Sequence, residues 1–417
     1  MTGGLQMTGG ERMRTVDEHR AAALALVTPL PVVDVGLDEA RGHVLAADVV
    51  ALGPVPAWDN SAMDGYAVRS ADVAAVTSDR PVTLTVVADL AAGSAAMPRV
   101  GPGTAARIMT GAPVPPGADA VVPVELTDGG TGLVQVREAV DPGRHVRRAG
   151  DDVRAGAVVL AAGTLLAERH VAAAAAVGVA RLSVHRRPRV AVLSTGSELV
   201  PPGEAVRRGQ IPDSNSFLLA AAVAAAGCTA IRLEAVPDDA DRLRAVLTAQ
   251  DGAVDAVITS GGVSVGAYDV VKEVLSAMGT VEFVAVAMQP GKPQGLGRLP
   301  SGTPVFCLPG NPVSVFVSFE VLVRPALLRL RGLRRTERPT ELAVALDGWR
   351  TPPGRAQYMP VALADADGSL QARRAVPGGS GSHLVTGLAR ADGLAVVPVD
   401  VAEVRPGDTV LVFRSDT

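Results

Sequence analysis

Three strand-like segments each run directly into a loop rich in glycine and small polar residues. The segments read LSTGSEL (193–199), SGGVSVGAYD (260–269) and LPGNPVS (308–314). Glycine lets backbone N–H groups turn toward a ligand and approach it closely. The third loop also opens a helix at Ser314, where free N–H groups after Pro312 and the helix dipole favour anions. One such loop is weak evidence, because turns between strands and helices need glycine anyway. Three at the same edge of one sheet predict an anion-binding crevice.

Lysine is almost absent from the chain. Lysine and arginine together number 39, and only Lys272 and Lys292 are lysines. A lysine ammonium is a compact point charge that the planar fork of arginine does not reproduce. Within PGKPQGLG (290–297), Lys292 suits a phosphate or an oxyanion. For Lys272, a plain position on a helix surface explains the residue equally well.

Four carboxylates are expected at the same sheet edge. Glu198 and Asp269 end two of the loops, and Asp238 and Asp239 follow the intervening strand. Together they could hold Mg²⁺, which prefers oxygen ligands and shares them with substrate phosphates. Alternatively, Asp238 or Asp239 caps the next helix and Asp269 belongs to a first helical turn. The spacing does not decide between these interpretations.

A second polar region lies earlier in the chain, in DNSAMDGYAV (59–68) and RIMTGAPVPPGADAVVPVE (107–125). The first stretch places two aspartates, an asparagine and a serine between Trp58 and Tyr66. A substrate contact and a hydrogen-bonded turn clamped by two aromatic rings explain it equally well.

The elements that must position these loops follow from hydrophobic patterning. Between 188 and 330, continuous apolar runs alternate with helical stretches, which predicts a mostly parallel sheet covered on both faces. The expected strands are 189–194, 230–236, 254–260, 281–288 and 303–308, and the expected helices are 213–227, 240–249, 269–278 and 313–330. Ligands bind such sheets beyond the carboxyl ends of the strands. Residues 15–30 begin with a capping box at Thr15 and Glu18 and predict a helix. Short valine-rich runs predict a β-rich domain at about 50–150 and a small β barrel or sandwich at 340–417.

Composition excludes several classes of protein. The net charge of −4 and the pI near 5.9 provide no basic stripe for nucleic acid. Apolar runs such as 217–227 stop short of the roughly 18 residues that a membrane helix needs. The start, MTGGLQMTGG, has no apolar signal-peptide core. Two distant cysteines and six scattered histidines indicate neither a disulfide framework nor a zinc or histidine metal centre. A soluble, cytoplasmic protein is expected.

Taken together, these strings resemble the molybdopterin molybdenumtransferase family, that of MoeA and the gephyrin E domain. Further matching pieces are RRAGDDV (147–153), PGKP, a late PGR (353–355) and GSH (381–383). They occur in family order from about residue 14 to 413. Each piece alone is unspecific, but the ordered set is highly specific.

The resemblance implies a multidomain fold of α/β and β parts. An elongated dimerisation or linker domain would comprise 14–49 with 154–187, interrupted by a β-rich inserted domain at 50–153. A three-layer α/β molybdopterin-binding domain would span 188–335, and a C-terminal β-barrel 336–417.

The resemblance also implies a reaction. Molybdate is inserted into the dithiolene of adenylylated molybdopterin with Mg²⁺-dependent release of AMP, in a cytoplasmic homodimer. The adenylyltransferase that supplies the substrate and the apo-molybdoenzymes that receive the cofactor are the implied partners. No nucleic acid and no membrane is involved.

The positions that match the family's motifs imply which residues of this chain form the site. Catalytic roles fall on Asp59, Thr110, Asp152, Glu198, Asp269 and Lys292. Substrate contacts fall on Ser264, Gly310, Asn311 and Ser314, with Arg355 and Ser382 joining Lys292 around molybdate. Metal ligands would come from Glu198, Asp238, Asp239 and Asp269. In this family the site is completed across the dimer, so Asp59 and Thr110 would serve the partner's α/β domain.

One departure and two alternatives remain open. Gln289 stands where many relatives have lysine, which removes a positive charge near the oxyanion while keeping hydrogen-bond donors. Preference for molybdate over tungstate is not decided. The second interpretation is that the α/β domain performs the related adenylyltransferase step. The β-rich insertion and the barrel argue against this function. A scaffold like the gephyrin E domain is the third, but the intact Asp59, Glu198, Asp269 and Lys292 favour an enzyme.

Overall fold

The computed structural model describes residues 12–263, 270–278, 281–366 and 368–415. They form two compact units, each described by itself below. The first unit comprises Met1–Val33, Gly42–Ala46 and Val184–Thr417, and the second comprises Asp34–Arg41 and Ala47–Ser183. Within the described residues, no helix is both long and apolar enough to cross a bilayer.

A six-stranded sheet forms the centre of the first unit. Its order is β16 (Thr229–Arg232), β13 (Arg189–Ser194), β17 (Ala256–Ser260), β21 (Pro304–Leu308), β20 (Pro293–Arg298) and β18 (Val281–Ala285). The first four strands are mutually parallel, and β20 and β18 pair antiparallel at the other edge. Every residue of β17 and β21 is buried, as expected for parallel strands covered on both faces. The predicted mostly parallel α/β sheet is confirmed.

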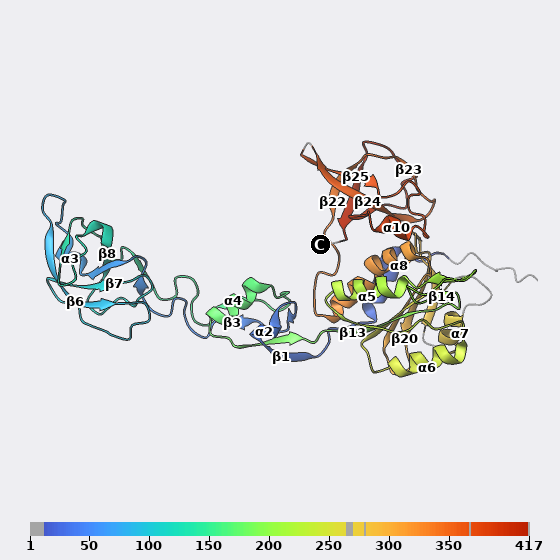
Figure 1. The fold of residues 1–417 in the computed structure, drawn as a ribbon, viewed down its shortest axis with the longest axis horizontal. Coiled ribbons are helices and arrows are strands. Elements are labelled where there is room, and N and C mark those ends of the chain that lie inside the picture. The colour runs from blue at the N-terminus through green and yellow to red at the C-terminus, as the bar shows by residue number, and fades with distance from the viewer. Residues whose placement is uncertain (1–11, 264–269, 279–280, 367, 416–417) are drawn as a thin grey trace, which may run out of the picture. The chain divides into compact units, whose positions relative to one another are not determined.

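Helices cover both faces of this sheet (Figure 1). Successive residues of β13 point to opposite faces, so that Val190 and Val192 join one core and Ala191 and Leu193 the other. The first core contains α1 (Val16–Ala25), α5 (Asn215–Ala225), α8 (Pro312–Ser318) and α9 (Arg324–Leu330). The second contains α6 (Ala240–Gln250) and α7 (Val270–Ala277). A π-helical turn, η2 (Phe319–Val323), joins α8 to α9, where the sequence predicts one continuous helix.

The glycine-rich stretch 290–297 is mostly a strand rather than a loop. Lys292 directly precedes β20, and Gly295 lies inside it. A Cβ on Gly295 would stand 2.7 Å from the Phe283 ring and 2.8 Å from Cys307 Cβ. Glycine is therefore required at this position for close packing between strands.

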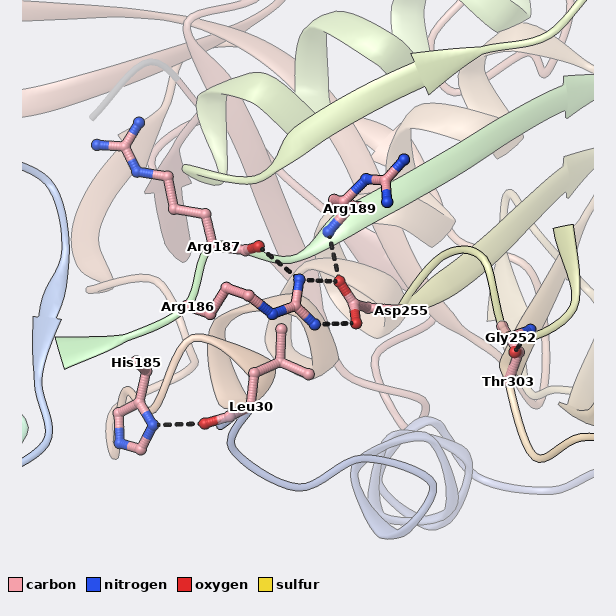
Figure 2. A network of polar contacts seen from close by, with 8 residues as sticks. All are labelled: Leu30, His185, Arg186, Arg187, Arg189, Gly252, Asp255 and Thr303. Atoms are coloured by element: carbon pink, nitrogen blue, oxygen red, sulfur yellow. Dashed lines mark hydrogen bonds and ion pairs between the residues drawn. The ribbon is translucent and has the colours of Figure 1, made fainter. Parts of the chain in front are cut away.

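An arginine–carboxylate pair fixes the point where the chain enters the α/β sheet (Figure 2). Arg186 donates from Nη1 and Nη2 to the two oxygens of Asp255, at 2.9 and 2.6 Å. The Arg189 N–H donates to the same carboxylate at 2.7 Å. Paired Arg–carboxylate hydrogen bonds are among the strong ones in proteins. The contact anchors the start of β13 beside the residue that precedes β17.

The C-terminal part of the first unit is a closed barrel. Its strands are β22 (Glu341–Ala345), β24 (Ala356–Ala366), β25 (Ser369–Arg374), β26 (Gly393–Val397) and β28 (Thr409–Arg414). The sheet runs β24-β25-β22-β28-β26 and closes through a further β24–β26 pairing. A short strand from the α/β segment, β19 (Met288–Gln289), pairs parallel with the start of β24. The expected β-barrel is confirmed, and β19 ties it to the α/β segment.

The second unit is β-rich. Its five-stranded sheet has the order β8 (Ala120–Pro123), β5 (Gly65–Val68), β7 (Thr104–Ile108), β6 (Val82–Leu90) and β9 (Leu133–Val136). A two-residue pairing joins β4 (Asn60–Ser61) to β10 (Val146–Arg147). Further elements are α2 (Leu37–Ala40), β3 (Val49–Val50), α3 (Ser70–Val73), β11 (Val158–Leu160) and α4 (Glu168–Ala176). Tyr66 is fully buried in the sheet core, whereas Trp58 is 56% exposed, so two aromatic rings do not clamp the Asp59 turn.

Candidate functional site

The three predicted loops converge at the carboxyl ends of β13, β17 and β21. The Thr195 N–H donates to the Ser260 carbonyl at 2.9 Å, and the Gly261 N–H to the Leu308 carbonyl at 3.1 Å. A Cβ on Gly261 would lie 2.6 Å from the Thr195 carbonyl oxygen, and one on Gly310 3.5 Å from the Gly261 Cα. The loops therefore pack backbone against backbone, and the contact at Gly261 is one that only glycine permits. Over the described residues 193–199, 260–263 and 308–314, their predicted placement at one sheet edge is confirmed.

Asn215, the first residue of α5, cross-links two of these loops. Its Nδ2 donates to Ser260 Oγ at 2.9 Å and to the Gly310 carbonyl at 2.7 Å. A carbonyl oxygen can only accept, so these contacts also fix the orientation of the amide. Just before it, the buried Asp213 carboxylate accepts from Ser194 Oγ at 2.9 Å. The sequence predicts only the start of a helix at residue 213. The cluster of polar residues before this alanine-rich helix could have indicated a site role.

Two predicted carboxylates flank one tight turn after β13. The Ser197 N–H donates to Asp238 Oδ2 at 3.0 Å, and the Asp238 N–H donates back to Ser197 Oγ at 2.9 Å. The exposed Glu198 side chain folds over Gly196, where a Cβ would stand 2.5 Å from Oε2. Asp239 instead caps α6, accepting from the Arg242 N–H at 2.9 Å. Asp238 thus contacts the loop, whereas Asp239 caps α6. The alternative prediction, that one of the two aspartates caps the next helix, is confirmed for Asp239.

The carboxylates provide a small donor set for a divalent cation. Over the described ranges, no group of three or more His, Cys, Asp or Glu side chains is arranged to hold a metal. Two of the predicted site residues, Asp269 and Ser264, lie outside those ranges. Mg²⁺ is commonly bound by only one or two carboxylates, with substrate phosphates and water completing the shell. Glu198 and Asp238, beside the same turn, fit this smaller set.

The N-terminus of α8 is joined to the barrel. Asn311 is the N-cap, and its Nδ2 donates to Ser382 Oγ at 3.0 Å. The Val313 N–H donates to the Ser382 carbonyl at 3.1 Å. The structure therefore brings together Asn311 and Ser382, two predicted substrate residues 71 positions apart. Since a protein carbonyl occupies the Val313 N–H, the helix start offers fewer free donors than the sequence predicts. Ser314 is buried, 4% exposed.

Lys292 extends from a firmly held loop. Gln294 Nε2 donates to the Gly291 carbonyl and to Ser318 Oγ, both at 2.7 Å. The Lys292 carbonyl accepts from the Val286 N–H at 2.7 Å, whereas its side chain is exposed. The backbone is thus fixed on both sides while the ammonium group remains accessible to a ligand.

Arg355 and Gln289 lie beside this loop. Arg355 Nη1 donates to Gln289 Oε1 at 2.7 Å, so the glutamine carbonyl faces the arginine. On β24, Gln357 Nε2 donates to Ser380 Oγ at 3.0 Å, two residues before Ser382. The β19–β24 pairing places Gln289 opposite Gln357. These contacts join Arg355 to Gln289, three positions before Lys292, and Gln357 to Ser380, two positions before Ser382.

The second unit holds the remaining predicted residues. Asp59 accepts from the Ala149 N–H at 2.8 Å and from Arg148 Nη1 at 2.6 Å. These contacts, the backbone donor first, hold the pKa of Asp59 below its usual value. Among the residues that the structure describes, the exposed Asp152 side chain makes no hydrogen bond. The hydrogen-bonded turn and the site role of Asp59 are therefore compatible, because the turn holds the carboxylate charged.

Sequence reasoning missed Asp64, which positions Thr110. Its Oδ1 accepts from the Thr110 N–H at 2.7 Å and from Thr110 Oγ1 at 2.8 Å. These two bonds lower the pKa of Asp64. Because the Thr110 hydroxyl donates its hydrogen bond to the Asp64 carboxylate, only its oxygen lone pairs remain for a ligand. At Asp59 and Thr110 the second unit thus offers hydrogen-bond acceptors.

Comparisons with known proteins agree along the chain. Three family models match in succession: MoeA N-terminal region (domain I and II) at residues 14–178, probable molybdopterin binding domain at 191–329, and MoeA C-terminal region (domain IV) at 343–414. Molybdopterin molybdenumtransferase 2 of Mycobacterium tuberculosis is 46% identical over 407 residues, covering 96% of this chain and 99% of the relative. The Haemophilus influenzae molybdopterin molybdenumtransferase is 35% identical over 405 residues, covering 96% and 98%. A crystal structure of the MoeA protein from Pyrococcus horikoshii aligns with a TM-score of 0.84 and 32% identity, covering 97% of this chain and 99% of that one.

Proposed function

Because the chain belongs to the MoeA family, we propose that it is a molybdopterin molybdenumtransferase, an enzyme of molybdenum cofactor biosynthesis. The supporting relatives match over nearly their full length and carry that name. The observation that carries the proposal is the convergence of three glycine loops beside the exposed Lys292. Such a crevice suits a substrate with a phosphoanhydride and an oxyanion as co-substrate.

The substrates in this proposal are adenylylated molybdopterin and molybdate, with AMP as the released product. Amide groups of the three loops would hold the phosphoanhydride, and Gly310, Asn311 and Ser314 lie next to it. Lys292, Arg355 and Ser382 would hold molybdate, where one ammonium and one guanidinium balance its two negative charges. Groups fixed before the reaction stabilise developing charge without reorganising, which is their main catalytic contribution.

A magnesium ion would be held by Glu198 and Asp238, with Asp269 as a further ligand. When bound, Mg²⁺ would supply positive charge at the phosphoanhydride as AMP leaves. The protein's own part is to orient both carboxylates through the Ser197 turn, to which Asp238 is bonded in both directions. Gly196 contributes by leaving space for the Glu198 carboxylate.

Asp59, Thr110 and Asp152 would complete the site of the partner in a cytoplasmic homodimer. The acceptor character of Asp59 and Thr110 supports this role, because it complements the N–H donors and cations proposed for the crevice. The pterin ring, rich in N–H groups, is the part of the substrate that such acceptors suit. An adenylyltransferase supplying the substrate and apo-molybdoenzymes receiving the product are the partners that follow from this place in the pathway.

A reconstitution with adenylylated molybdopterin, molybdate and Mg²⁺ tests the proposal. Lys292→Ala and Glu198→Ala should keep their circular dichroism spectra and melting temperatures but abolish cofactor formation. Lys272→Ala removes the chain's other lysine, on the exposed side of α7, and should retain wild-type yield. Wild-type cofactor yield from Lys292→Ala or Glu198→Ala would remove these residues from the mechanism. No cofactor from the wild-type protein would contradict the proposed function itself.

A further inference from the structure

A second hollow in the first unit lies apart from the residues assigned above. It has a volume of about 300 Å³. It is lined by α5 and the residue after it, from Leu218 to Ala226, by Phe316 and Ser415, and by three charged side chains. The α5 wall consists of one leucine and four alanines, so it is apolar and smooth. None of the residues proposed to bind adenylylated molybdopterin, molybdate or magnesium lines it.

The charged side chains are Glu320, Arg324 and Arg338, which leaves one positive charge in excess. Arg338 donates from Nε to Glu320 Oε2 at 2.6 Å and from Nη2 to Oε1 at 3.3 Å, and both side chains are more than nine-tenths buried. Arg324 is only 4.0 Å from the same carboxylate, and in the described part of the chain its side chain has no hydrogen bond. Glu320 thus hydrogen-bonds Arg338, and Arg324 lines the hollow with only a loose, shared ion pair to the same carboxylate.

The loose Glu320–Arg324 ion pair lies at the π-helical turn. Glu320 and Arg324 are spaced i,i+4, a spacing that brings opposite charges together on a regular α-helix. Here η2 (Phe319–Val323) contains Glu320, and Arg324 is the first residue after it. Such turns are rare and occur frequently at functional sites. Here the pair is 4.0 Å apart, while Glu320 accepts a 2.6 Å hydrogen bond from Arg338.

A mostly buried cation that shares its one counter-charge with a second arginine is unfavourable. Burial lowers the pKa of Arg324, and the neighbouring Arg338 lowers it further. A guanidinium nevertheless stays charged in proteins. Removing such a charge from water is costly unless an anion compensates it.

We propose that this hollow binds a small aliphatic carboxylate, with its carboxylate on Arg324 and its hydrocarbon chain along the alanine wall of α5. A single negative charge matches the single excess positive charge, and Glu320 would repel a dianion. An aliphatic body matches the apolar wall, and the volume is at the lower end of small-molecule pockets. The site is independent of the molybdenum chemistry.

Hexanoate is a suitable probe for this hollow. Hexanol, which lacks the charge, and inorganic phosphate, which lacks the hydrocarbon chain, are the comparisons. Calorimetric titration of the full-length protein should give saturable hexanoate binding with a Kd on the order of 1 mM, and no saturable binding of either comparison. Arg324→Met should weaken hexanoate binding at least tenfold. The matched variant Arg329→Met, on the exposed face of α9, should bind as the wild type does.

A second variant, Ala221→Leu, keeps the charge of Arg324 and fills part of the hollow. Ala221→Leu adds volume from the exposed side of α5 and should also weaken hexanoate at least tenfold, whether or not Arg324→Met folds. Equal binding of hexanol, or unchanged hexanoate binding in Ala221→Leu, would overturn the proposal. So would an effect of Arg324→Met on the oligomeric state, measured by light scattering, without saturable hexanoate binding. That result would assign Arg324 to a protein interface.

Discussion

Gln289 determines how much positive charge surrounds the proposed molybdate position. Its carbonyl accepts from Arg355, so the glutamine orients the guanidinium instead of adding a second ammonium group. In the described ranges, Gln289 Nε2 has no other partner, which leaves amide protons for an oxyanion. Glutamine in place of the family lysine at position 289 therefore removes one positive charge. In return, it orients the Arg355 guanidinium and provides a hydrogen-bond donor.

Gln289→Glu should weaken molybdate binding about tenfold, because one charge changed within a few ångströms at a partly exposed site is worth roughly 1–2 kcal/mol. The carboxylate would pair with Arg355, neutralise it and lose the amide donors. The KM for molybdate in the reconstitution is the measurement. Gln250→Glu, at the end of α6, makes the same change remote from the crevice and should not alter this KM. An unchanged molybdate KM in Gln289→Glu would separate this residue from the oxyanion.

Arg148 helps to keep Asp59 ionised, after the stronger effect of the Ala149 N–H. Because the folded-state pKa of Asp59 is lowered, its contacts stabilise the protein above the usual aspartate pKa. This stabilisation is lost as the pH falls through the lowered value. Arg148→Met should raise the pKa of Asp59 toward the ordinary value near 3.8, measured by carboxyl-carbon NMR. Arg147→Met, one residue earlier and exposed, should leave it unchanged. A pKa of Asp59 unaffected by Arg148→Met would assign the lowering to Ala149 alone.

Single residues were predictable where their role is local. The capping box at Thr15 and Glu18 is present in both directions, at 3.1 and 2.8 Å. Asn215 and Asp64 were missed because their partners are distant in the sequence; Asn215, for example, donates to the Gly310 carbonyl, 95 positions away. Asp213 has a local partner in Ser216, but its contact with Ser194 is 19 positions away. A side chain's spacing does not reveal such contacts before the fold is known.

At the scale of elements, glycine contacts hold the three loops together. Gly261 has φ +97° and a hypothetical Cβ 2.6 Å from a backbone oxygen, whereas Gly302 has φ +101° and open space around it. Both positions are strained for alanine, but only Gly261 also faces a collision with backbone.

Gly261→Ala should therefore destabilise the protein by more than Gly302→Ala, for which the backbone strain alone costs about 1–3 kcal/mol. It should also abolish cofactor formation, because moving the loop after β17 displaces Thr195. Denaturant unfolding and the reconstitution assay measure the two effects. Equal stability and equal activity of the two variants would show that the loops do not depend on this contact.

Elements with strong hydrophobic patterning were predicted well. The segments 189–194, 254–260 and 303–308 correspond to β13, β17 and β21, and 240–249 to α6. The strand β20 was missed, because its glycines indicate a loop unless the neighbouring Phe283 and Cys307 are known. Patterning also left barrel and sandwich open for 340–417, since closure depends on the pairing of β24 with β26.

At the scale of the whole molecule, the proposed catalytic residues are divided between the two units. Asp59, Thr110 and Asp152 lie in the second unit, and all other described site residues lie in the first. The four domain boundaries and the dimer remain predictions. A division of this kind requires that the units of one or of two subunits meet when substrate is bound.

Mixing inactive variants distinguishes the two possibilities. In a homodimer with shared sites, Asp59→Ala and Lys292→Ala subunits form mixed dimers in which one of two sites is intact. After denaturation and joint refolding in equal amounts, about a quarter of wild-type activity should return. Each variant refolded alone should stay inactive. If the mixture also stays inactive while light scattering reports dimers, each site is built within one subunit.

The most direct test of the central claim is an anomalous-scattering measurement at the molybdenum edge on crystals soaked with molybdate and AMP. The claim is that the loops after β13, β17 and β21, together with Lys292, Arg355 and Ser382, form one site for both anions. The strongest molybdenum peak should lie within contact distance of Lys292, Arg355 and Ser382, with AMP phosphate density against the three loops. Molybdenum peaks confined to other arginines, with those three residues empty and AMP elsewhere, would contradict the account.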